Sequence, residues 1–585
     1  MRFNELATVF NKLESTSKRL EMTDYIVELL KKSNPSEVDE IIYLLLGTIG
    51  PSFNESELGL GVSLVEQAIA NATGYSLKQV DELFKKTGDL GETAEKLVEK
   101  KKQSSLFSKA LTVSHVYNSL KKISEAEGSG SQTLKIRLLS ELLGNANGLE
   151  AKYLTRIALG ELRLGVNAPT VLDALSVYSA GDKSLRSVFE KAFNVTSDLG
   201  LVAKTFFEKG LKAVKELKMT AERPVMPALC ERLPNAREII ERFGKCAVEH
   251  KYDGMRVLVH KNKQKVKIFS RRQNDLTSMF PEIVAAVKEL PFDSLILDGE
   301  VLSFNDVTGE YLPFQGTVQR KRKYGVDKLK KEFPVHVFFF DILFKDGEDL
   351  TELPFKQRRK ILEEVIKEND VLKLAKEIIT DSAEELEKFF NEAVEKGLEG
   401  VVVKDLNAPY TVGARKFAWV KLKRSYSGGL EDSVDLAVVG FYRGKGKRTG
   451  FGFGGFLGCV YDKTREKFVT IARVGSGFSE EDLAFFNEKL TNLKLKKKSS
   501  LVDSLIEPDF WVEPKLVVEV IADEITRSPV HTCGRDENGL GFALRFPRFV
   551  KIREDKGVFD VTTVEEIKQM FENQKRTKLE ESSQL

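Results

Sequence analysis

The feature that most constrains the fold is a change of texture along the 585-residue chain. Up to about residue 215, apolar residues recur at the spacing of amphipathic helices, as in Leu134–Leu143 and Leu154–Leu164. Ser36–Asp39 forms a capping-box pattern before the apolar run that starts at Ile41. After Pro224–Pro227 the pattern becomes β-rich. A chain of this length exceeds a single hydrophobic core, so we expect about three or four domains.

The middle of the chain alternates apolar β-like runs with two helical patterns, which predicts an α/β or α+β domain. The β-like runs are Ser294–Phe304, Val335–Phe344, Gly400–Lys404 and Phe417–Lys423, and the helical patterns are Gln357–Glu368 and Ala383–Lys396.

A linker at Ser425–Gly429 opens a third region. Its short strands lie among glycine-rich turns, a pattern typical of a small β-barrel. We expect these strands at Val434–Phe441, Phe456–Tyr461 and Leu516–Ile521.

Composition excludes several classes of protein. Apolar residues make up 42% and charged residues 31%, and the net charge is only +3, so a nucleic-acid surface requires local basic patches such as Lys494–Lys498. The four cysteines form no C-x-x-C pair, which argues against a zinc site or a disulfide framework. No apolar run resembles a signal peptide or approaches the ~20 residues that span a bilayer. We therefore expect a cytoplasmic protein that does not bind membranes.

The segment Glu249–Arg256 places a lysine at the polar end of a predicted strand. Cys246–His250 precedes Lys251 and Val257–His260 follows it, so a sheet is expected to hold this lysine rigidly. A lysine held in this way becomes a nucleophile if its surroundings favour the neutral amine. The motif is short, and a solvated surface lysine is the alternative interpretation.

Ionisable residues also interrupt or end the other apolar strands of the middle region. They are Glu300, Asp341, Glu399, Lys404, Lys421 and Lys423. Side chains alternate faces along a strand, so Trp419, Lys421 and Lys423 are expected to share one face, as are Glu249, Lys251 and Asp253. An uncompensated buried charge costs several kcal/mol, roughly. A single cleft into which these side chains converge is the most economical arrangement.

Such a cleft suits a nucleoside triphosphate and a divalent metal ion. The lysines and the arginines Arg256 and Arg271 are suited to phosphate groups, and the acids to the metal ion. Phe340 is a candidate to stack on the base, although an aromatic residue in Phe338–Phe340 is more often part of a core. The sequence contains no P-loop and no set of kinase motifs.

In their order and residue types, these motifs resemble those of the ATP-dependent DNA ligases of archaeal and eukaryotic type. The motifs that carry the resemblance are Lys251-Tyr-Asp-Gly-Met-Arg256, Phe269-Ser-Arg-Arg272, Leu297-Asp-Gly-Glu300, Phe340-Asp-Ile-Leu343, Glu399-Gly-Val-Val-Val-Lys404, Trp419-Val-Lys-Leu-Lys423 and Arg553-Glu-Asp-Lys556. Gly160–Gly165 is also similar to the DNA-binding domain of this family.

The resemblance implies a multidomain fold. An all-α DNA-binding domain would comprise residues 1–217, an α+β nucleotidyltransferase (adenylation) domain residues 218–424, and an OB-fold barrel with a C-terminal helix and tail residues 425–585.

The resemblance also implies a role for each matched residue. Lys251 would form lysyl-AMP. The nucleotide would be bound by Glu249, Arg256, Arg271, Glu300, Phe340, Arg415, Lys421 and Lys423. Glu300 and Glu399 would hold Mg²⁺ or another divalent metal. Arg553, Asp555 and Lys556 would orient the leaving pyrophosphate. His250 is expected to point to the opposite face from Lys251 and to be structural.

The implied activity is the sealing of nicks in duplex DNA during replication, recombination and repair. ATP would be the co-substrate, and the protein would be a monomer associated with the nucleoid. Gln103–Ala110 resembles a sliding-clamp peptide, with candidate contacts Gln103, Leu106 and Phe107, and the alternative is a polar loop between helices.

Three other classes of protein share part of this pattern. An RNA ligase or a GTP-using capping enzyme shares the nucleotidyltransferase motifs but usually lacks so large a helical region before the lysine. The missing zinc cysteines disfavour an NAD-dependent ligase. A non-catalytic DNA-binding protein would not explain lysines and carboxylates inside strands.

Overall fold

A computed structural model describes residues 1–16, 18–54, 57–101, 109–233, 235–304, 334–396, 398–413, 415–423, 433–444 and 452–572. The chain divides into two compact units, Met1–Lys218 and Met219–Leu585. No helix in the described ranges is both long enough and apolar enough to span a membrane. The candidate clamp residues Gln103, Leu106 and Phe107 lie outside the described residues.

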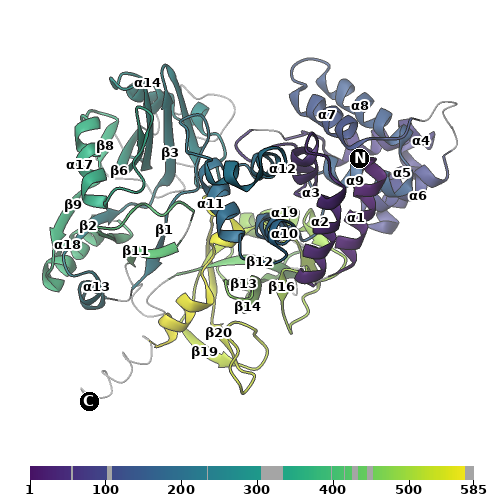
Figure 1. Ribbon diagram of the computed structural model, residues 1–585. Helices are drawn as coiled ribbons and strands as arrows, with labels where there is room; N and C mark the ends of the chain where they lie inside the picture. The colour runs from purple at the N-terminus through teal and green to yellow at the C-terminus, as the bar shows by residue number, and fades with distance from the viewer. Residues whose placement is uncertain are drawn as a thin grey trace. The chain divides into compact units, whose positions relative to one another are not determined.

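The regular elements of the first unit, in its described residues, are helices joined by loops (Figure 1). Its helices are α1 (Phe3–Ser15), α2 (Arg19–Lys32), α3 (Val38–Leu45), α4 (Val62–Thr73), α5 (Leu77–Thr87), α6 (Leu90–Glu99), α7 (Val113–Glu125), α8 (Ser131–Asn145), α9 (Gly148–Ala158), α10 (Ala168–Ala180), α11 (Arg186–Thr196) and α12 (Leu199–Lys215). One hydrophobic core runs through this unit, with Phe3, Phe10 and Phe189 fully buried.

Two local predictions in this unit were wrong. The helix expected at Leu154–Leu164 ends at Ala158, because Gly160 and Arg163 take positive φ angles of 68° and 57°. The Arg163 guanidinium instead pairs with the buried Asp89 carboxylate at 3.1 Å. The capping box expected at Ser36 is absent as well, since α3 starts after Glu37 without a side-chain cap.

The second unit begins with two sheets. The five-stranded sheet has the order β1 (Leu229–Arg232), β11 (Arg415–Lys423), β10 (Gly400–Asp405), β2 (Cys246–Lys251) and β9 (Glu377–Thr380). The six-stranded sheet contains β4 (Lys265–Ser270), β3 (Met255–Asn262), β5 (Ser294–Ser303), β6 (Val335–Lys345) and β7 (Glu348–Asp349), and β8 (Leu372–Leu374) pairs with β6. The expected strands are confirmed to within two residues at each end.

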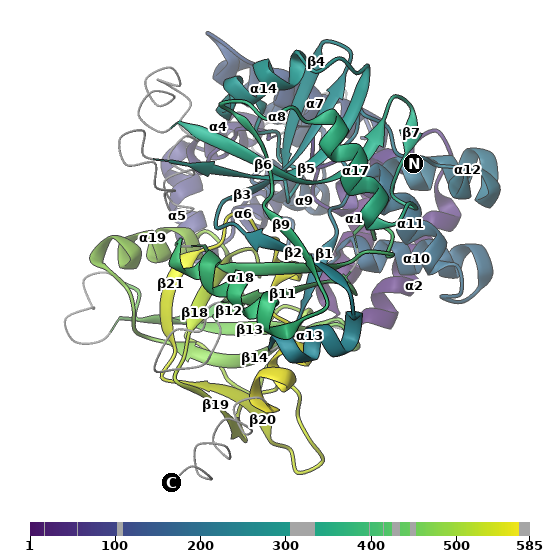
Figure 2. The same ribbon diagram turned by 90° about the vertical axis from the view of Figure 1, so that its left-hand side faces the viewer.

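Short helices cover these sheets. They are α13 (Ala236–Phe243), α14 (Pro281–Lys288), α17 (Phe355–Val365), α18 (Ala383–Glu395) and the 3-10 turn η1 (Thr277–Met279). Helix α17 packs on β6, and α18 packs on β2, β9 and β10. Figure 2 shows α13 and α18 running beside the five-stranded sheet.

The C-terminal part of this unit is β-rich. An eight-stranded sheet has the order β15 (Lys494–Leu495), β17 (Phe510–Val512), β12 (Val434–Tyr442), β13 (Gly455–Asp462), β14 (Lys467–Val474) and β16 (Val502–Asp503). It continues through β18 (Val517–Ile521), which pairs with both β12 and β21 (Arg548–Ile552). The hairpin β19 (Glu524–Ser528) and β20 (Gly541–Arg545), helix α19 (Glu480–Thr491), the turn η4 (Val558–Asp560) and a helical stretch at 564–572 complete it.

Not every strand charge faces a common cleft, which corrects part of the sequence interpretation. Asp341 is fully buried on β6 and accepts hydrogen bonds from the Arg358 guanidinium of α17 at 2.8 and 3.0 Å. Arg358 also donates to the carbonyl oxygens of Leu353 and Ala408. This pair joins helix to sheet and is structural.

We predict that Asp341→Ala lowers the free energy of unfolding of this unit by about 3–5 kcal/mol, because it leaves the buried Arg358 without its counter-charge. Chemical denaturation followed by tryptophan fluorescence measures the change. Glu241→Gln is the control, since Glu241 is 68% exposed and lies 3.7 Å from an exposed Arg237. Equal stability of Asp341→Ala and the control would contradict a structural role for the pair.

Candidate active site

Three neighbouring strands form the floor of a pocket in the second unit. The register places Val402 of β10 between Glu249 of β2 and Lys421 of β11. Gly400 lies in the same way between Lys251 and Lys423. Alternate residues share a face of a sheet, and all four charged side chains line the pocket. The predicted common face for Trp419, Lys421 and Lys423 is thereby confirmed.

A glycine is required between the two lysines at the open end of this floor. Gly400 has a φ of 137°, and a Cβ there would lie 2.2 Å from the carbonyl oxygen of Leu422. The neighbouring Glu399 donates its backbone N–H to the carbonyl oxygen of Lys251 at 3.1 Å. The close approach of the backbones sets the carboxylate of Glu399 beside both lysines.

The ammonium of Lys251 forms an ion pair with Glu399 at 2.5 Å, and Lys423 lies 3.4 Å from the same carboxylate. Burial opposes ionisation of Glu399, but Lys251, Lys423 and Arg553 hold its pKa well below the ordinary value. A fixed negative charge therefore orients Lys251 within the pocket. His250 stacks on Phe389, with 4.5 Å between ring centroids. This contact is in keeping with the structural role predicted for His250, which stays a prediction.

Glu249 is one of the most buried residues that line the pocket. Its carboxylate is 2% exposed, forms an ion pair with the Lys404 ammonium at 2.7 Å and lies 3.7 Å from Arg359. Burial raises the pKa of Glu249 to about 7, while Lys404 and Arg359 oppose this rise and Glu377 adds to it. The sequence pattern marks Lys404 as a charge within a strand but indicates no role for it. No sequence pattern points to Arg359.

Aromatic rings form a wall next to Glu249. Of the residues in Phe338–Phe340, Phe340 lines the pocket, and its ring centroid lies 6.0 Å from that of Trp419. The Lys404 ammonium lies 4.9 Å from the Phe340 ring and 4.2 Å from the Trp419 ring. The neighbouring Phe339 is fully buried in the core.

Arg256 and Glu300 lie opposite each other on β3 and β5 and both line the pocket. The Arg256 guanidinium donates to both oxygens of Asp298 at 3.0 and 2.7 Å. The Tyr410 hydroxyl also donates to Asp298, at 2.6 Å. Asp298 lies within a matched motif but was given no role, and the structure makes it the anchor of Arg256. Burial raises the pKa of Glu300 to about 8, although Lys251 and Arg256 oppose the shift.

The remaining predicted cations differ in where they lie. Arg271 follows β4, lines the pocket and pairs with Asp560 at 3.1 Å. The backbone of Arg415 begins β11, and its side chain lies outside the described structure. Lys421 is 3.6 Å from Glu566, and burial lowers the pKa of Lys421 to about 7 despite this carboxylate.

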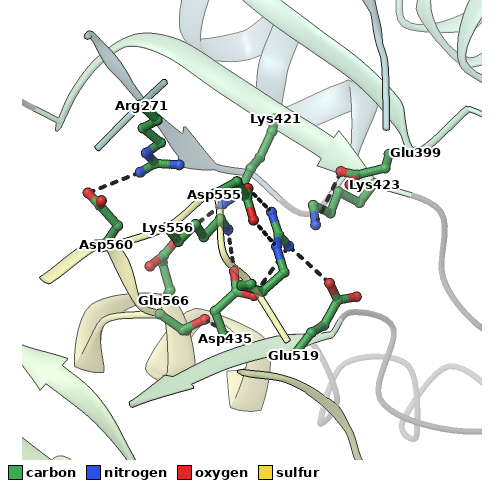
Figure 3. Close-up of polar contacts among 12 residues, drawn as sticks. Arg271, Glu399, Lys421, Lys423, Asp435, Glu519, Asp555, Lys556, Asp560 and Glu566 are labelled. Carbon is green, nitrogen blue, oxygen red and sulfur yellow. Dashed lines mark hydrogen bonds and ion pairs between the residues drawn. The ribbon is translucent and has the colours of Figure 1, made fainter. Parts of the chain in front are cut away.

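The segment that follows β21 closes the pocket from the β-rich side. Arg553, Asp555 and Lys556 all line it, together with the residues of the sheet floor. Figure 3 shows Asp555 and Lys556 close to Lys421, with Arg271 approaching Asp560 nearby. Burial and the charge of Arg553 lower the pKa of Lys556 to about 8.

The pocket thus combines a lysine held by an ion pair, an aromatic ring, a buried acid and several further lysines and arginines. Cations outnumber carboxylates among its lining residues, which suits a polyanion. The described residues contain no cluster of three or more His, Cys, Asp or Glu side chains able to hold a metal ion without further ligands. This arrangement is chemically suited to the transfer of a nucleotidyl group to an amine.

Comparison with known proteins identifies the family. Residues 2–176 match the DNA ligase N terminus, residues 227–423 the ATP dependent DNA ligase domain, and residues 449–556 the ATP dependent DNA ligase C terminal region. A probable DNA ligase of Dictyoglomus thermophilum is 48% identical, and the match covers 100% of both chains. DNA ligase 2 of Thermofilum pendens is 44% identical and a DNA ligase of Sulfurisphaera tokodaii is 41% identical, each over 99% of both chains. These matches span the helical unit, the pocket and the β-rich region alike, and the chain therefore belongs to the ATP-dependent DNA ligases.

Proposed function

We propose that this DNA ligase seals nicks in duplex DNA through a lysyl-AMP intermediate on Lys251. The observation that carries the proposal is the Lys251–Glu399 ion pair. Further lysines and arginines line the same pocket, together with the aromatic rings of Phe340 and Trp419. A nucleotide seated there presents its α-phosphate to the lysine if its base lies at the Glu249 end.

In the first step, the Nζ of Lys251 attacks the α-phosphorus of ATP. A phosphoramidate bond forms, the bond from the α-phosphorus to the bridging oxygen breaks, and pyrophosphate leaves with the electron pair. Lys421 and Lys423 stabilise the charge on the α-phosphate, and Arg553, Asp555 and Lys556 orient the leaving pyrophosphate. The attacking amine must be neutral, so its proton passes to Glu399 or to solvent before attack.

Two further transfers complete the reaction. The 5′-phosphate at the nick takes AMP from Lys251, which restores the free amine. The 3′-hydroxyl then attacks this activated phosphate, a phosphodiester bond forms, and AMP leaves. These transfers depend on alignment and charge neutralisation more than on acid–base groups.

Different residues of the pocket recognise the base, the ribose and the phosphates of the nucleotide. Glu249 accepts a hydrogen bond from the adenine amino group and Phe340 stacks on the ring. Glu300 binds the ribose or the metal ion, and Arg256, Arg271 and Arg415 contact ribose or phosphates. The enclosed position of Glu249 and the exposed face of Phe340 within the pocket support the first two assignments.

We further propose Mg²⁺ as the metal ion, held by Glu300 and Glu399. Mg²⁺ commonly uses one or two carboxylates together with substrate phosphates, and both of these carboxylates line the pocket. When bound, the ion would neutralise charge on the phosphates. It would also favour the ionised form of Glu300, whose pKa burial raises to about 8.

The division into domains is proposed as a DNA-binding domain at 1–217, an adenylation domain at 218–424 and an OB-fold at 425–585. The compact unit Met1–Lys218 and the short antiparallel strands after Val434 support it. We propose that the helical domain and the barrel grip the DNA backbone and minor groove without reading sequence, and that the protein acts as a monomer. Association with the nucleoid and roles in replication, recombination and repair follow from such an activity.

We also propose that Gln103, Leu106 and Phe107 bind a sliding clamp. The sequence Gln103–Ala110 supports this, because a glutamine followed by apolar residues suits a peptide that docks in an apolar groove.

We predict that Lys251→Ala abolishes the AMP adduct, because the Nζ of Lys251 is the amine to which AMP is attached, whereas Lys421 and Lys423 contact the α-phosphate without bonding to it. The protein is incubated with α-labelled ATP and Mg²⁺, and then with a nicked duplex. The native chain is expected to form an acid-labile adduct and to seal the nick. Lys267→Ala, at an exposed lysine, is the matched control and is expected to behave like the native chain. Labelling by GTP alone, or sealing of RNA alone, would overturn the proposal.

Glu249 gives a pH prediction. Its carboxylate, with a pKa raised to about 7 by burial, is ionised above that pH and protonated below it. The ionised carboxylate only accepts hydrogen bonds, as the adenine amino group requires, whereas the protonated form also carries an O–H donor. The preference for ATP over GTP is therefore expected to fall as the pH drops below about 7. Lys404 and Arg359 favour the ionised form, and Glu377 opposes it.

Rates of enzyme–AMP and enzyme–GMP formation across this pH range measure the preference. Glu249→Gln is expected to reduce it by about 10- to 100-fold and to remove its pH dependence. Glu387→Gln, at an exposed acid of α18, is the control. A preference that is independent of pH in the native chain would refute base reading by the Glu249 carboxylate.

For the clamp, we predict that the double variant Leu106→Ala and Phe107→Ala is no longer retained by purified sliding clamp. Nick sealing without the clamp is expected to stay unchanged. Ser104→Ala with Ser105→Ala is the matched control and should be retained like the native chain. If the variant with Leu106→Ala and Phe107→Ala is retained as well as the native chain, the proposal that these residues bind the clamp is wrong.

A further inference from the structure

Two carboxylates of the β-rich region lie directly opposite each other on neighbouring strands. Asp435 of β12 pairs in register with Glu519 of β18, and the two residues are only 7% and 5% exposed. Like charges at opposed positions destabilise a sheet, and burial adds to the cost. Such a pair persists when cations compensate it.

The compensating cations belong to β21 and to the segment after it that closes the pocket. The Arg553 guanidinium donates to Glu519 at 2.9 Å and to Asp435 at 3.3 Å. The Lys556 ammonium forms a hydrogen-bonded ion pair with Asp435. Lys551 lies 3.7 Å from Glu519 and opposite it in the register. Figure 3 shows the carboxylates of Asp435 and Glu519 on the side of this segment away from Lys421.

The acids and the cations differ in their relation to the pocket. Arg553 and Lys556 line it, and Asp435 and Glu519 do not. Asp435 therefore acts on any bound phosphate only through the cations that it holds. Two residues of one short segment are thus fixed by one carboxylate behind them.

The backbone of Asp435 is itself tied to the end of that segment. Its N–H donates to the Thr562 hydroxyl at 3.0 Å, and its carbonyl oxygen accepts from the Thr562 N–H at 3.0 Å. The Arg553 N–H donates to the carbonyl oxygen of Val517 on β18 at 2.9 Å. The anchor therefore consists of two paired strands, and the chain is attached to β18 before Lys556 and to β12 after it.

The charged states of Lys556 and Asp435 depend on each other. Burial and Arg553 lower the pKa of Lys556, and Lys423 and Arg271 add to the effect, whereas Asp435 opposes it. Burial would raise the pKa of Asp435, but Lys556 and Arg553 hold it well below its ordinary value. The carboxylate stays ionised and keeps a buried ammonium charged next to other cations.

We propose that Asp435, supported by Glu519, is the positioning residue that aims Arg553 and Lys556 at the leaving pyrophosphate when AMP is transferred to Lys251. The inference rests on the proposed role of Arg553 and Lys556. It assigns a function to two acids that lie outside every sequence motif of the site. Pyrophosphate is present only in the first step, so the positioning residue matters for adenylation and not for the final sealing of DNA.

The test separates the two steps for the full-length protein. Asp435→Asn keeps the shape of the side chain and removes its charge. We expect formation of enzyme–AMP to slow by about 10²-fold, the effect of misplacing a reacting group by an ångström. Sealing of a nick that already carries AMP on its 5′-phosphate is expected to keep its native rate.

Asp462→Asn is the matched control, because Asp462 is a buried carboxylate of β13 in the same region and accepts from the Arg465 N–H. It is expected to change neither rate. Glu519→Gln is the second variant, with the same selective loss in smaller degree, since Arg553 retains Asp435 and a two-bond pair with Asp555. If Asp435→Asn fails to fold, Glu519→Gln tests the positioning role in its place.

Lys556→Met distinguishes the inference from the function on which it rests. Normal adenylation by Lys556→Met would overturn the proposed role of the segment itself. Slow adenylation by Lys556→Met together with normal adenylation by Asp435→Asn would overturn only the positioning role. An equal loss of both steps in Asp435→Asn and in Glu519→Gln would reduce the two acids to structural residues.

Discussion

The second unit depends on the pairing of charges that its sheets remove from water. A buried ion costs several kcal/mol, roughly, unless an opposite charge and hydrogen bonds compensate it. The structure satisfies this demand in two ways. Asp341 with Arg358 forms a closed structural pair, whereas Lys251, Lys423 and Glu399 form an open group that faces the pocket. Open groups of this kind can exchange a protein partner for a phosphate or a metal ion.

The register of the five-stranded sheet brings the charged side chains of the pocket together. Residues that are far apart in the sequence become neighbours because β10 lies between β2 and β11. Gly400 lets these backbones approach, and the two lysines and Glu399 then meet at one end. At the other end, Glu249 and Lys404 form a buried ion pair. A nucleotide bound as proposed would lie with its axis from base to phosphate along the strands.

Much of this could be predicted from the sequence, because strands and their alternation are local properties. The strands around Lys251, Glu300 and Lys421 were predicted correctly, and so was the face shared by Lys421 with Lys423. Local patterns failed where a distant partner decided the outcome. The helix expected to continue past Ala158 ends there, and Arg163 pairs with Asp89, which lies 74 residues away in the sequence. The charge of Asp341 looked catalytic until its partner Arg358 was known.

The same limit explains why the acids behind the pocket were missed. The residues of a motif follow one another over a few positions, as the pocket residues Arg553 and Lys556 do. Asp435 meets Lys556 across 121 residues and Arg553 across 118 residues, so no local spacing connects them. Within Val434–Phe441 an aspartate appears as an ordinary polar residue of a strand. Only the pairing of β12 with β18 brings it opposite Glu519 and makes a costly pair of acids that requires cations. The geometry of a nucleotide site is therefore set by residues that the substrate does not touch, and the tertiary fold, rather than the sequence pattern, identifies them.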